Sequence, residues 1–391
     1  MIVTKPPMGW NSWNTFGESI NEKVVMETAD YLVESGLKDC GYEYVIIDDC
    51  WSLRERDEKG EIVPDPEKFP HGMKYVSDYI HSKGLKFGMY SCAGTLTCAR
   101  YPGSYDHEFV DAECFARWGV DYLKYDYCFH PSSTHGHYLY KRMGLALANC
   151  GRDIVFAACS WGAENTKTWI KETGAHTWRS TGDINDSWES IKHLAQDQMQ
   201  VTEYNGSGCF NDMDMLVVGM NGKGNVAVTG CTVDEYRTHF AYWAMMGSPL
   251  IIGCDLRKAD ENAMSILKNR MLIEIDQDEA YRQPFFINTE REFNKNRTAG
   301  GTLYESYPLD ECILARFLSN GDIALGAFNF RDGAVRLNAQ LDSIGLGECT
   351  GKTLELTSAW TGKTSRVTNG TLIVELGAHC CEVFRAKVVD K

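Results

Sequence analysis

Between about residue 8 and residue 275, short apolar runs alternate with longer stretches in which apolar residues recur every three or four positions. The short runs predict buried strands, and the longer stretches predict amphipathic helices. The predicted strands span residues 8–13, 44–51, 86–92, 122–128, 154–161, 177–184, 208–216 and 249–256. Eight strands that alternate with helices favour a parallel (β/α)8 TIM barrel over an open doubly wound sheet.

The helical stretches carry recognisable start and stop signals. In "NEKVVMETADYLVESG", Asn21 can cap the first turn, apolar residues follow at helical spacing, and Gly36 ends the helix. Further helices are predicted at residues 72–82, 108–118, 187–198, 233–246 and 261–270.

After about residue 285 the pattern changes to short alternating runs separated by Asn-Gly and Thr-Gly turns. This pattern predicts an antiparallel β-sandwich domain. We therefore divide the chain into a barrel, residues 1–285, and a β domain, residues 286–391. Since no low-complexity linker separates them, we expect the two domains to pack closely.

Charged residues gather where the predicted strands end. In a (β/α)8 barrel this edge carries the active site. One such residue is usually structural, but five strands that end in charge are hard to explain by packing alone. The residues are Asp48, Asp49, Lys124, Asp126, Arg179, Asp183, Asp212, Asp214, Asp255 and Arg257.

Aromatic residues end several strands at the same edge, namely Trp13, Trp51, Tyr90 and Trp161. Flat rings beside carboxylates suit the apolar face and the hydroxyl groups of a sugar. Each ring taken alone fits a position in the core equally well.

The composition of the chain restricts the classes of molecule that it is expected to bind. A formal net charge of -15 and a pI near 5.2 disfavour nucleic acids and anionic membranes, and favour neutral or cationic small molecules. No apolar run reaches membrane-spanning length, and the N-terminus lacks a signal-peptide pattern. Fifteen irregularly spaced cysteines fit a reducing compartment, so we expect a cytoplasmic protein.

The clustered carboxylates have two competing uses, metal binding and acid–base catalysis. The 10 histidines form no H-E-x-x-H motif, and the acidic pairs do not match a calcium loop, so we expect no metal and no cofactor. Nucleotide-binding glycine motifs are absent as well. A hydrolase that works with two carboxylates is the better interpretation.

Six ordered motifs carry a family resemblance: "PPMGWNSWNTF", "YVIIDDCW", "FPHGMKYVSDYIHSKGLKFGMYS", "WGVDYLKYDYC", "WRSTGDINDSW" and "NDMDML". The whole chain strongly resembles glycoside hydrolase family 27, which comprises α-galactosidases and α-N-acetylgalactosaminidases. The resemblance implies that Asp126 is the nucleophile and Asp183 the acid/base of a retaining double displacement. Retaining enzymes hold these two groups about 5 to 6 Å apart.

The resemblance also implies a sugar pocket. Asp48 and Asp49 match the pair that binds the 6- and 4-hydroxyl groups, and Lys124 matches the lysine near the 3-hydroxyl. Other matching positions are Trp13, Tyr90, Cys159, Ser160, Trp161, Arg179, Asp214 and Met215. We expect Lys124 to keep Asp126 ionised, and the pKa of Asp183 to exceed that of Asp126.

The stretch "CSWGAEN" matches the segment that reads the 2-position of the sugar. Ser160 and Ala163, taken alone, resemble α-N-acetylgalactosaminidases. The Trp-Gly pair and Cys159 resemble plant and microbial members, so we predict an exo-α-galactosidase that acts on terminal α-galactosides. An α-N-acetylgalactosaminidase is the first alternative, and an inactive carbohydrate-binding protein on the same fold is a remote one. Assembly into a homo-oligomer is left open.

Two cysteine predictions rest on the same resemblance. Cys98 and Cys128 match a pair that is disulfide-bonded in secreted relatives. The usual partner of Cys50 is replaced by Gly17, so Cys50 is expected to be a free thiol.

Overall fold

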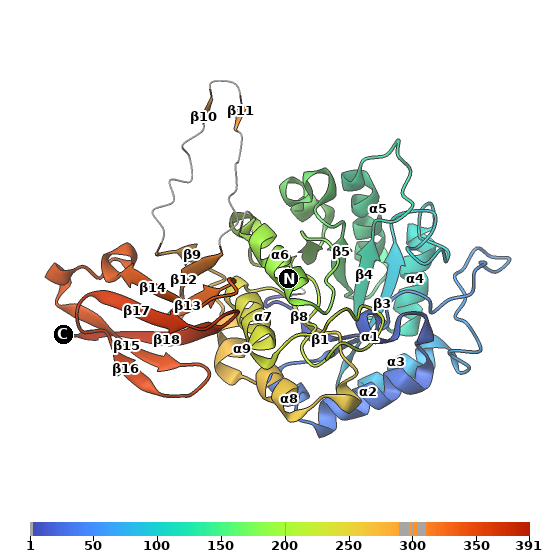
Figure 1. Ribbon diagram of the computed structural model, residues 1–391. Helices are drawn as coiled ribbons and strands as arrows, with labels where there is room; N and C mark the ends of the chain where they lie inside the picture. The colour runs from blue at the N-terminus through green and yellow to red at the C-terminus, as the bar shows by residue number, and fades with distance from the viewer. Residues whose placement is uncertain (1–2, 200, 289–296, 299–300, 303–309) are drawn as a thin grey trace.

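The computed structural model describes residues 3–199, 201–288, 297–298, 301–302 and 310–391. Figure 1 shows a barrel with its surrounding helices and, packed against one side of it, a domain of antiparallel strands. The predicted fold class, a (β/α)8 barrel followed by an antiparallel β domain, is therefore confirmed.

Eight parallel strands form the barrel, in the order β7-β6-β5-β4-β3-β2-β1-β8. The ring closes through Leu216, whose N–H donates to Ile251 O (2.7 Å) and whose carbonyl accepts from Gly253 N (2.9 Å). The strands are β1 (Met8–Asn11), β2 (Tyr44–Ile46), β3 (Lys86–Cys92), β4 (Tyr122–Asp126), β5 (Val155–Cys159), β6 (Thr177–Arg179), β7 (Phe210–Asp212) and β8 (Leu250–Ile252).

The barrel interior is a packed layer rather than a pore. Its buried members come from alternate positions of the strands, as the two-residue period requires. They are Val3, Tyr44, Ile46, Tyr122, Val155, Ala157, Phe210, Met215 and Ile251. This layer closes the barrel beneath the rim, so the polar residues at the strand ends lie above packed apolar side chains that exclude water.

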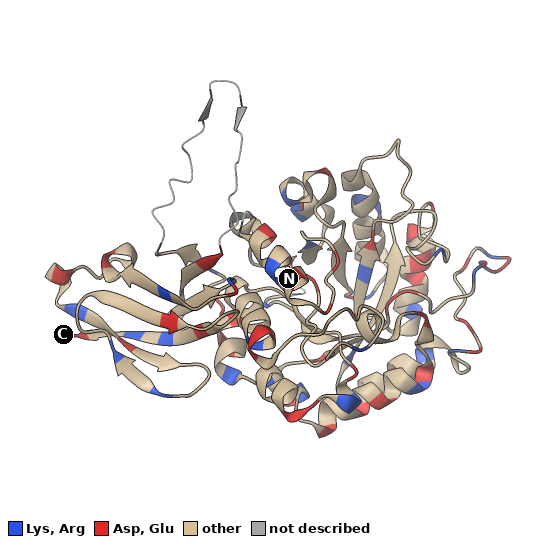
Figure 2. Cartoon of the chain, viewed as in Figure 1, with Lys and Arg blue, Asp and Glu red and all other residues tan. Residues whose placement is uncertain are grey.

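Helices cover the outside of the barrel, and acidic and basic residues are interspersed on their outer faces (Figure 2). The main ones are α2 (Glu22–Glu34), α3 (Gly72–Ser82), α4 (Glu108–Trp118), α5 (Gly136–Asn149), α6 (Trp188–Gln198) and α7 (Val233–Met246). As predicted, Asn21 caps α2 by accepting from Val24 N at 3.0 Å. Helix α5 is absent from the predicted helices.

The predicted helix 261–270 ends early, as α8 (Glu261–Leu267), and a second helix that was not predicted follows it, α9 (Arg270–Asp276). The side chain of Asn269 accepts a hydrogen bond from Leu272 N (3.2 Å) and so begins a new helix. The sequence signal that the prediction missed is a capping side chain, Asn269, inside an apolar stretch.

The C-terminal domain pairs a six-stranded antiparallel sheet with a two-stranded one, β14 (Val335–Gln340) and β17 (Thr371–Leu376). A separate apolar core fills the space between them. The predicted boundary after residue 285 falls inside β9. The six strands are β9 (Phe285–Phe286), β12 (Glu311–Phe317), β13 (Ile323–Asn329), β15 (Lys352–Ser358), β16 (Thr364–Arg366) and β18 (Cys381–Asp390).

Within the described part of the chain, no helix combines the length and the apolar character needed to cross a membrane.

Candidate active site

Strand β4 delivers Asp126 to the rim, where only 6% of the residue is exposed. The Tyr90 hydroxyl donates to its Oδ2 at 3.0 Å, and the Tyr127 N–H donates to its Oδ1 at 3.2 Å. Burial, only partly offset by the Lys124 ammonium, raises the pKa of Asp126 to about 6. The carboxyl group is therefore an anion at neutral pH, at a considerable desolvation cost.

Lys124 lies two residues earlier on the same face of β4. Its Nζ donates to Asp48 Oδ2 at 2.8 Å, and Asn11 Nδ2 donates to the same oxygen at 2.8 Å. Desolvation opposes the charged form, but Asp48 prevails and holds the pKa of Lys124 well above its ordinary value. Lys124 is thus a fixed cation, and it lowers the pKa of Asp126 as predicted.

Asp49 follows Asp48 and is held by a different set of donors. Its Oδ2 accepts from Ala99 N (2.9 Å) and its Oδ1 from Cys50 N (2.7 Å). Burial raises the pKa of Asp49, although these N–H donors favour the anion. Hydrogen bonds therefore fix the carboxyl groups of both aspartates.

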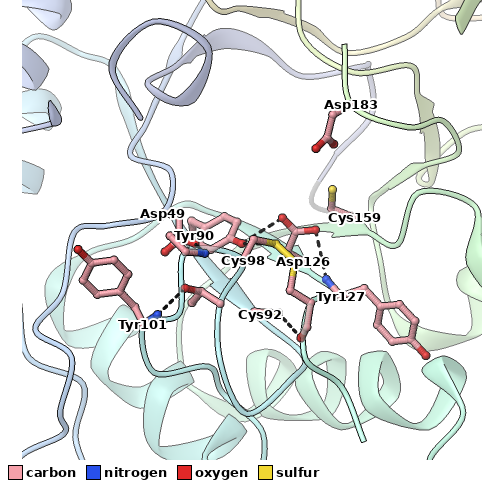
Figure 3. The surroundings of a disulfide bond; sticks show 12 residues. Asp49, Tyr90, Cys92, Cys98, Tyr101, Asp126, Tyr127, Cys159 and Asp183 are labelled. Atoms are coloured by element: carbon pink, nitrogen blue, oxygen red, sulfur yellow. Dashed lines mark hydrogen bonds between the residues drawn. A yellow bond between two sulfur atoms is a disulfide. The ribbon is translucent and has the colours of Figure 1, made fainter. Parts of the chain in front are cut away.

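Asp183 lies in the loop after β6, and its side chain is 74% exposed. Arg179, at the end of β6, donates through Nη2 to Asp183 Oδ1 at 2.7 Å. Figure 3 shows the carboxyl groups of Asp126 and Asp183 pointing toward one another across an open space beside Cys159. The sequence motifs are thus brought together as predicted.

The expected order of the two pKa values is wrong for the unliganded protein. Desolvation favours protonated Asp183, but the Arg179 guanidinium outweighs it and lowers the pKa of Asp183 below its ordinary value. The pKa of Asp126 is raised instead. The ion pair with Arg179, which the sequence spacing did not reveal, reverses the order.

Arg179 also pairs with Asp214, whose Oδ2 lies 2.9 Å from Nη2. Asp214 accepts N–H groups from Ile184 (2.7 Å) and Met215 (2.8 Å), and burial raises its pKa to about 6. Its φ of +82° is a conformation that costs a non-glycine residue free energy. A bond from Trp243 Nε1 to the Asp214 carbonyl (2.8 Å) helps to hold that conformation.

The predicted aromatic residues differ in their surroundings. Trp13, at the start of α1 (Trp13–Phe16), is half-buried and packs against the inner apolar layer that includes Met215. Trp161 is half-buried too, with a φ of +54°. Trp51 is buried: its Nε1 donates to Tyr90 O (2.9 Å), and its ring packs edge-on against Trp118. For Trp51 the core interpretation is the correct one.

The segment after β5 fixes the two small residues near the predicted 2-position. Ser160 is buried, and its hydroxyl shares a hydrogen bond with Thr166 Oγ1 at 2.5 Å. Cys159 Sγ accepts from Arg179 Nη1 at 3.6 Å, and burial raises the pKa of the thiol well above its ordinary value. Ser160 therefore already has a partner within its own loop.

Two charges predicted at the rim serve another purpose. Arg257 forms a bidentate pair with Asp255 (2.7 and 2.9 Å) and also contacts Glu27 of α2 at 2.5 Å. These groups join the strand end to an outer helix. They are not brought to Asp126 and Asp183.

The structure contains a disulfide between Cys98 and Cys128, which the resemblance left possible, and Cys50 is a buried free cysteine, as expected. Both disulfide sulfurs and one carboxylate oxygen of Asp126 lie within 4.8 Å of one another. The Tyr90 hydroxyl also contacts Cys98 Sγ at 3.4 Å. Because the sulfurs bond to each other, this group does not offer two thiolates to a metal.

The prediction missed Asn11 and Tyr127, which contact Asp48 and Asp126, and Glu164, which contacts Tyr127. Asn11 is a polar side chain inside a predicted apolar strand, which is a usable signal. The bond from the Tyr127 hydroxyl to Glu164 (2.8 Å) joins two loops, and nothing in the local sequence indicates it.

Comparisons with known proteins agree with this geometry. A family model described as "Alpha galactosidase A" matches residues 5–278, and one described as "Alpha galactosidase C-terminal beta sandwich domain" matches residues 312–386. An α-galactosidase of Cyamopsis tetragonoloba is 40% identical over 380 residues, covering 97% of this chain and 85% of that protein.

Solved structures give the same result. The crystal structure of α-galactosidase I from Mortierella vinacea superposes with a TM-score of 0.84 at 31% identity, covering 98% of this chain and 97% of that one. The structure of a Saccharomyces cerevisiae α-galactosidase with raffinose has a TM-score of 0.84 at 28% identity, covering 99% and 98% of the two chains.

Proposed function

Because the chain belongs to the α-galactosidase family, glycoside hydrolase family 27, and is a glycoside hydrolase, we propose that it is a retaining exo-α-galactosidase. The observation that carries the proposal is the pair of facing carboxyl groups, Asp126 and Asp183. The charge of Lys124 lowers the pKa of Asp126, and Arg179 donates to Asp183. Terminal α-galactosides, such as the raffinose bound by the yeast relative, are the substrates.

The pocket chemistry suits a galactose ring. Asp48 and Asp49 are buried acceptors for the 6- and 4-hydroxyl groups, and Lys124 is a fixed donor near the 3-hydroxyl. The half-exposed ring of Trp13 can cover the apolar face of the sugar. A site built to bond hydroxyl groups rejects analogues that lack them, because buried polar groups would lose their partners.

The first step forms a bond between a carboxylate oxygen of Asp126 and the anomeric carbon, while the bond to the leaving oxygen breaks. Asp183 gives its proton to that oxygen. In the second step Asp183 takes a proton from water, which attacks the anomeric carbon and releases Asp126. The retained configuration follows from two displacements at the same carbon.

The low pKa of Asp183 in the unliganded protein is compatible with this role. Its side chain is 74% exposed, so a bound substrate would cover it and remove water from the anion. Loss of that hydration favours the protonated acid. The bound substrate thereby promotes protonation of Asp183, which cleavage of the glycosidic bond requires.

Hydrolysis of the nitrophenyl α-galactoside and of its 2-acetamido counterpart tests the sugar. We expect the galactoside to be the better substrate. Ser160 and Ala163 resemble the residues of α-N-acetylgalactosaminidases, and a preference for the acetamido sugar would establish that alternative. Proton NMR of the first product should show the α-anomer; the β-anomer would exclude the double displacement.

The inactive carbohydrate-binding alternative and the cytoplasmic location are separate questions. The wild type should turn over substrate, and Asp126→Asn should lose this turnover while it still binds galactose. This result excludes a carbohydrate-binding protein without activity. The cytoplasmic location stays a prediction from the cysteine usage, which cell fractionation would test.

A further inference from the structure

The carboxylate of Glu164 joins two loops of the rim. It accepts from the Tyr127 hydroxyl (2.8 Å) and from Gly136 N (2.7 Å), and it lies 3.1 Å from His135 Nε2. Tyr127 and His135 belong to the loop between β4 and α5, whereas Glu164 belongs to the segment after β5. One side chain therefore fixes one loop to the other.

The groups around Glu164 favour its ionised carboxylate. His135 accepts from His137 N at its Nδ1 (3.1 Å), which places its proton on Nε2, the atom that faces Glu164. Gly136 begins the 14-residue helix α5, whose first N–H groups favour an anion. Desolvation acts in the opposite direction, but these donors lower the pKa of Glu164, so it is ionised.

The backbone at Glu164 is unusual. Glu164 and Asn165 both have a φ of +54°, a left-handed conformation that costs non-glycine residues free energy. The carbonyl of Glu164 accepts from Trp169 Nε1 at 2.9 Å, which helps to hold this conformation. The strained turn aims the Glu164 carboxylate at Tyr127.

Tyr127 links this cluster to Asp126. Its N–H donates to Asp126 Oδ1 (3.2 Å), and its buried ring stacks on His130 with centroids 3.9 Å apart. A Cβ at Gly136 would lie 2.9 Å from the Tyr127 hydroxyl, so that end of the ring is closely packed as well. The hydroxyl, the ring and the N–H of Tyr127 are thus held at three points.

We propose that Glu164 is a positioning residue for the nucleophile: its carboxylate holds Tyr127 so that the Tyr127 N–H stays on Asp126. This inference rests on the proposed role of Asp126. Glu164 touches no reacting atom and acts through Tyr127 alone. Without it, the N–H donor would drift, and the anion of Asp126 would lose part of its stabilisation.

The test compares Glu164→Ala, Glu164→Gln and Tyr127→Phe by the pH dependence of kcat and KM on the nitrophenyl α-galactoside. Glu164→Ala should lower kcat about tenfold with little change in KM, and the acid limb of kcat should move to higher pH. Glu164→Gln keeps an acceptor for the Tyr127 hydroxyl and should restore most of the rate. Tyr127→Phe should resemble Glu164→Ala, and the double variant should be no worse than either.

Glu172→Ala is the matched control, because its exposed carboxylate lies in the same region and only approaches His137 Nε2 at 3.7 Å. If the wild type is active and both Glu164→Ala and Tyr127→Phe keep its acid limb, the positioning role is overturned. The α-galactosidase proposal stands in that case. If Glu164→Ala fails to fold, Glu164→Gln and Tyr127→Phe decide. A wild type and a control that both lack turnover would refute the proposed function, and the positioning role with it.

Discussion

The Tyr90 hydroxyl is the donor to Asp126 that can be removed with least disturbance. Tyr90→Phe keeps the buried ring and deletes the 3.0 Å bond to Oδ2. A hydrogen bond to a charged group is worth about 1.5–3 kcal/mol, so its loss should weaken ionisation of Asp126 about 10- to 100-fold. With a pKa of about 6, the wild-type carboxyl is about nine-tenths ionised at pH 7. In Tyr90→Phe that fraction should fall to about a half or less.

The assay is kcat on the nitrophenyl α-galactoside from pH 4 to pH 9, because kcat reports the substrate complex, in which Asp183 is protonated. The acid limb of Tyr90→Phe should move upward by about 1 to 2 on the pH scale, so that kcat falls about 2- to 10-fold at pH 7, and its ratio to the wild-type kcat should approach one toward pH 9. Tyr101→Phe is the control, because its hydroxyl points away from Asp126 in Figure 3. A loss that is equal at every pH would show that the hydroxyl does not govern the charge of Asp126.

Three further predictions concern stability. Burial raises the pKa of Asp126 from 3.8 to about 6, so its anion costs the folded state about 3 kcal/mol above pH 6 and nothing below about pH 4. Asp126→Asn should therefore abolish turnover yet raise the unfolding midpoint at pH 7, by a margin that grows between pH 4 and 6; calorimetry that finds no gain contradicts this. Replacing Cys98 and Cys128 by serine should cost about 3–4 kcal/mol for a bond that spans 30 residues, and thermal unfolding unaffected by the change would refute it. Arg316→Met should cost about 1.5–3 kcal/mol, because it removes the buried hydrogen bonds from Arg316 Nη1 to the carbonyls of Ala244 (3.2 Å) and Met245 (3.3 Å) in α7; an unchanged denaturant midpoint would show otherwise.

Much of the fold could be predicted because local patterns report burial directly. The eight strand segments, the Asn21 cap and the change of pattern near residue 285 all follow from which side chains avoid water. Closure of the barrel through Leu216 and the break between α8 and α9 could not be predicted. Both depend on where a single backbone or side-chain group finds its partner.

The sequence by itself determined which residues reach the rim, since Asp126 and Arg179 end strands whose order is given by the alternation of elements. The tertiary structure decided what each residue does there. Arg179 belongs to Asp183 and Asp214, Asp255 is turned to Arg257, and the pKa of Asp126 exceeds that of Asp183. The reason is physical: a strand end fixes the position of a side chain, but charge and pKa depend on distances to groups far away in the chain, and on the water those groups exclude.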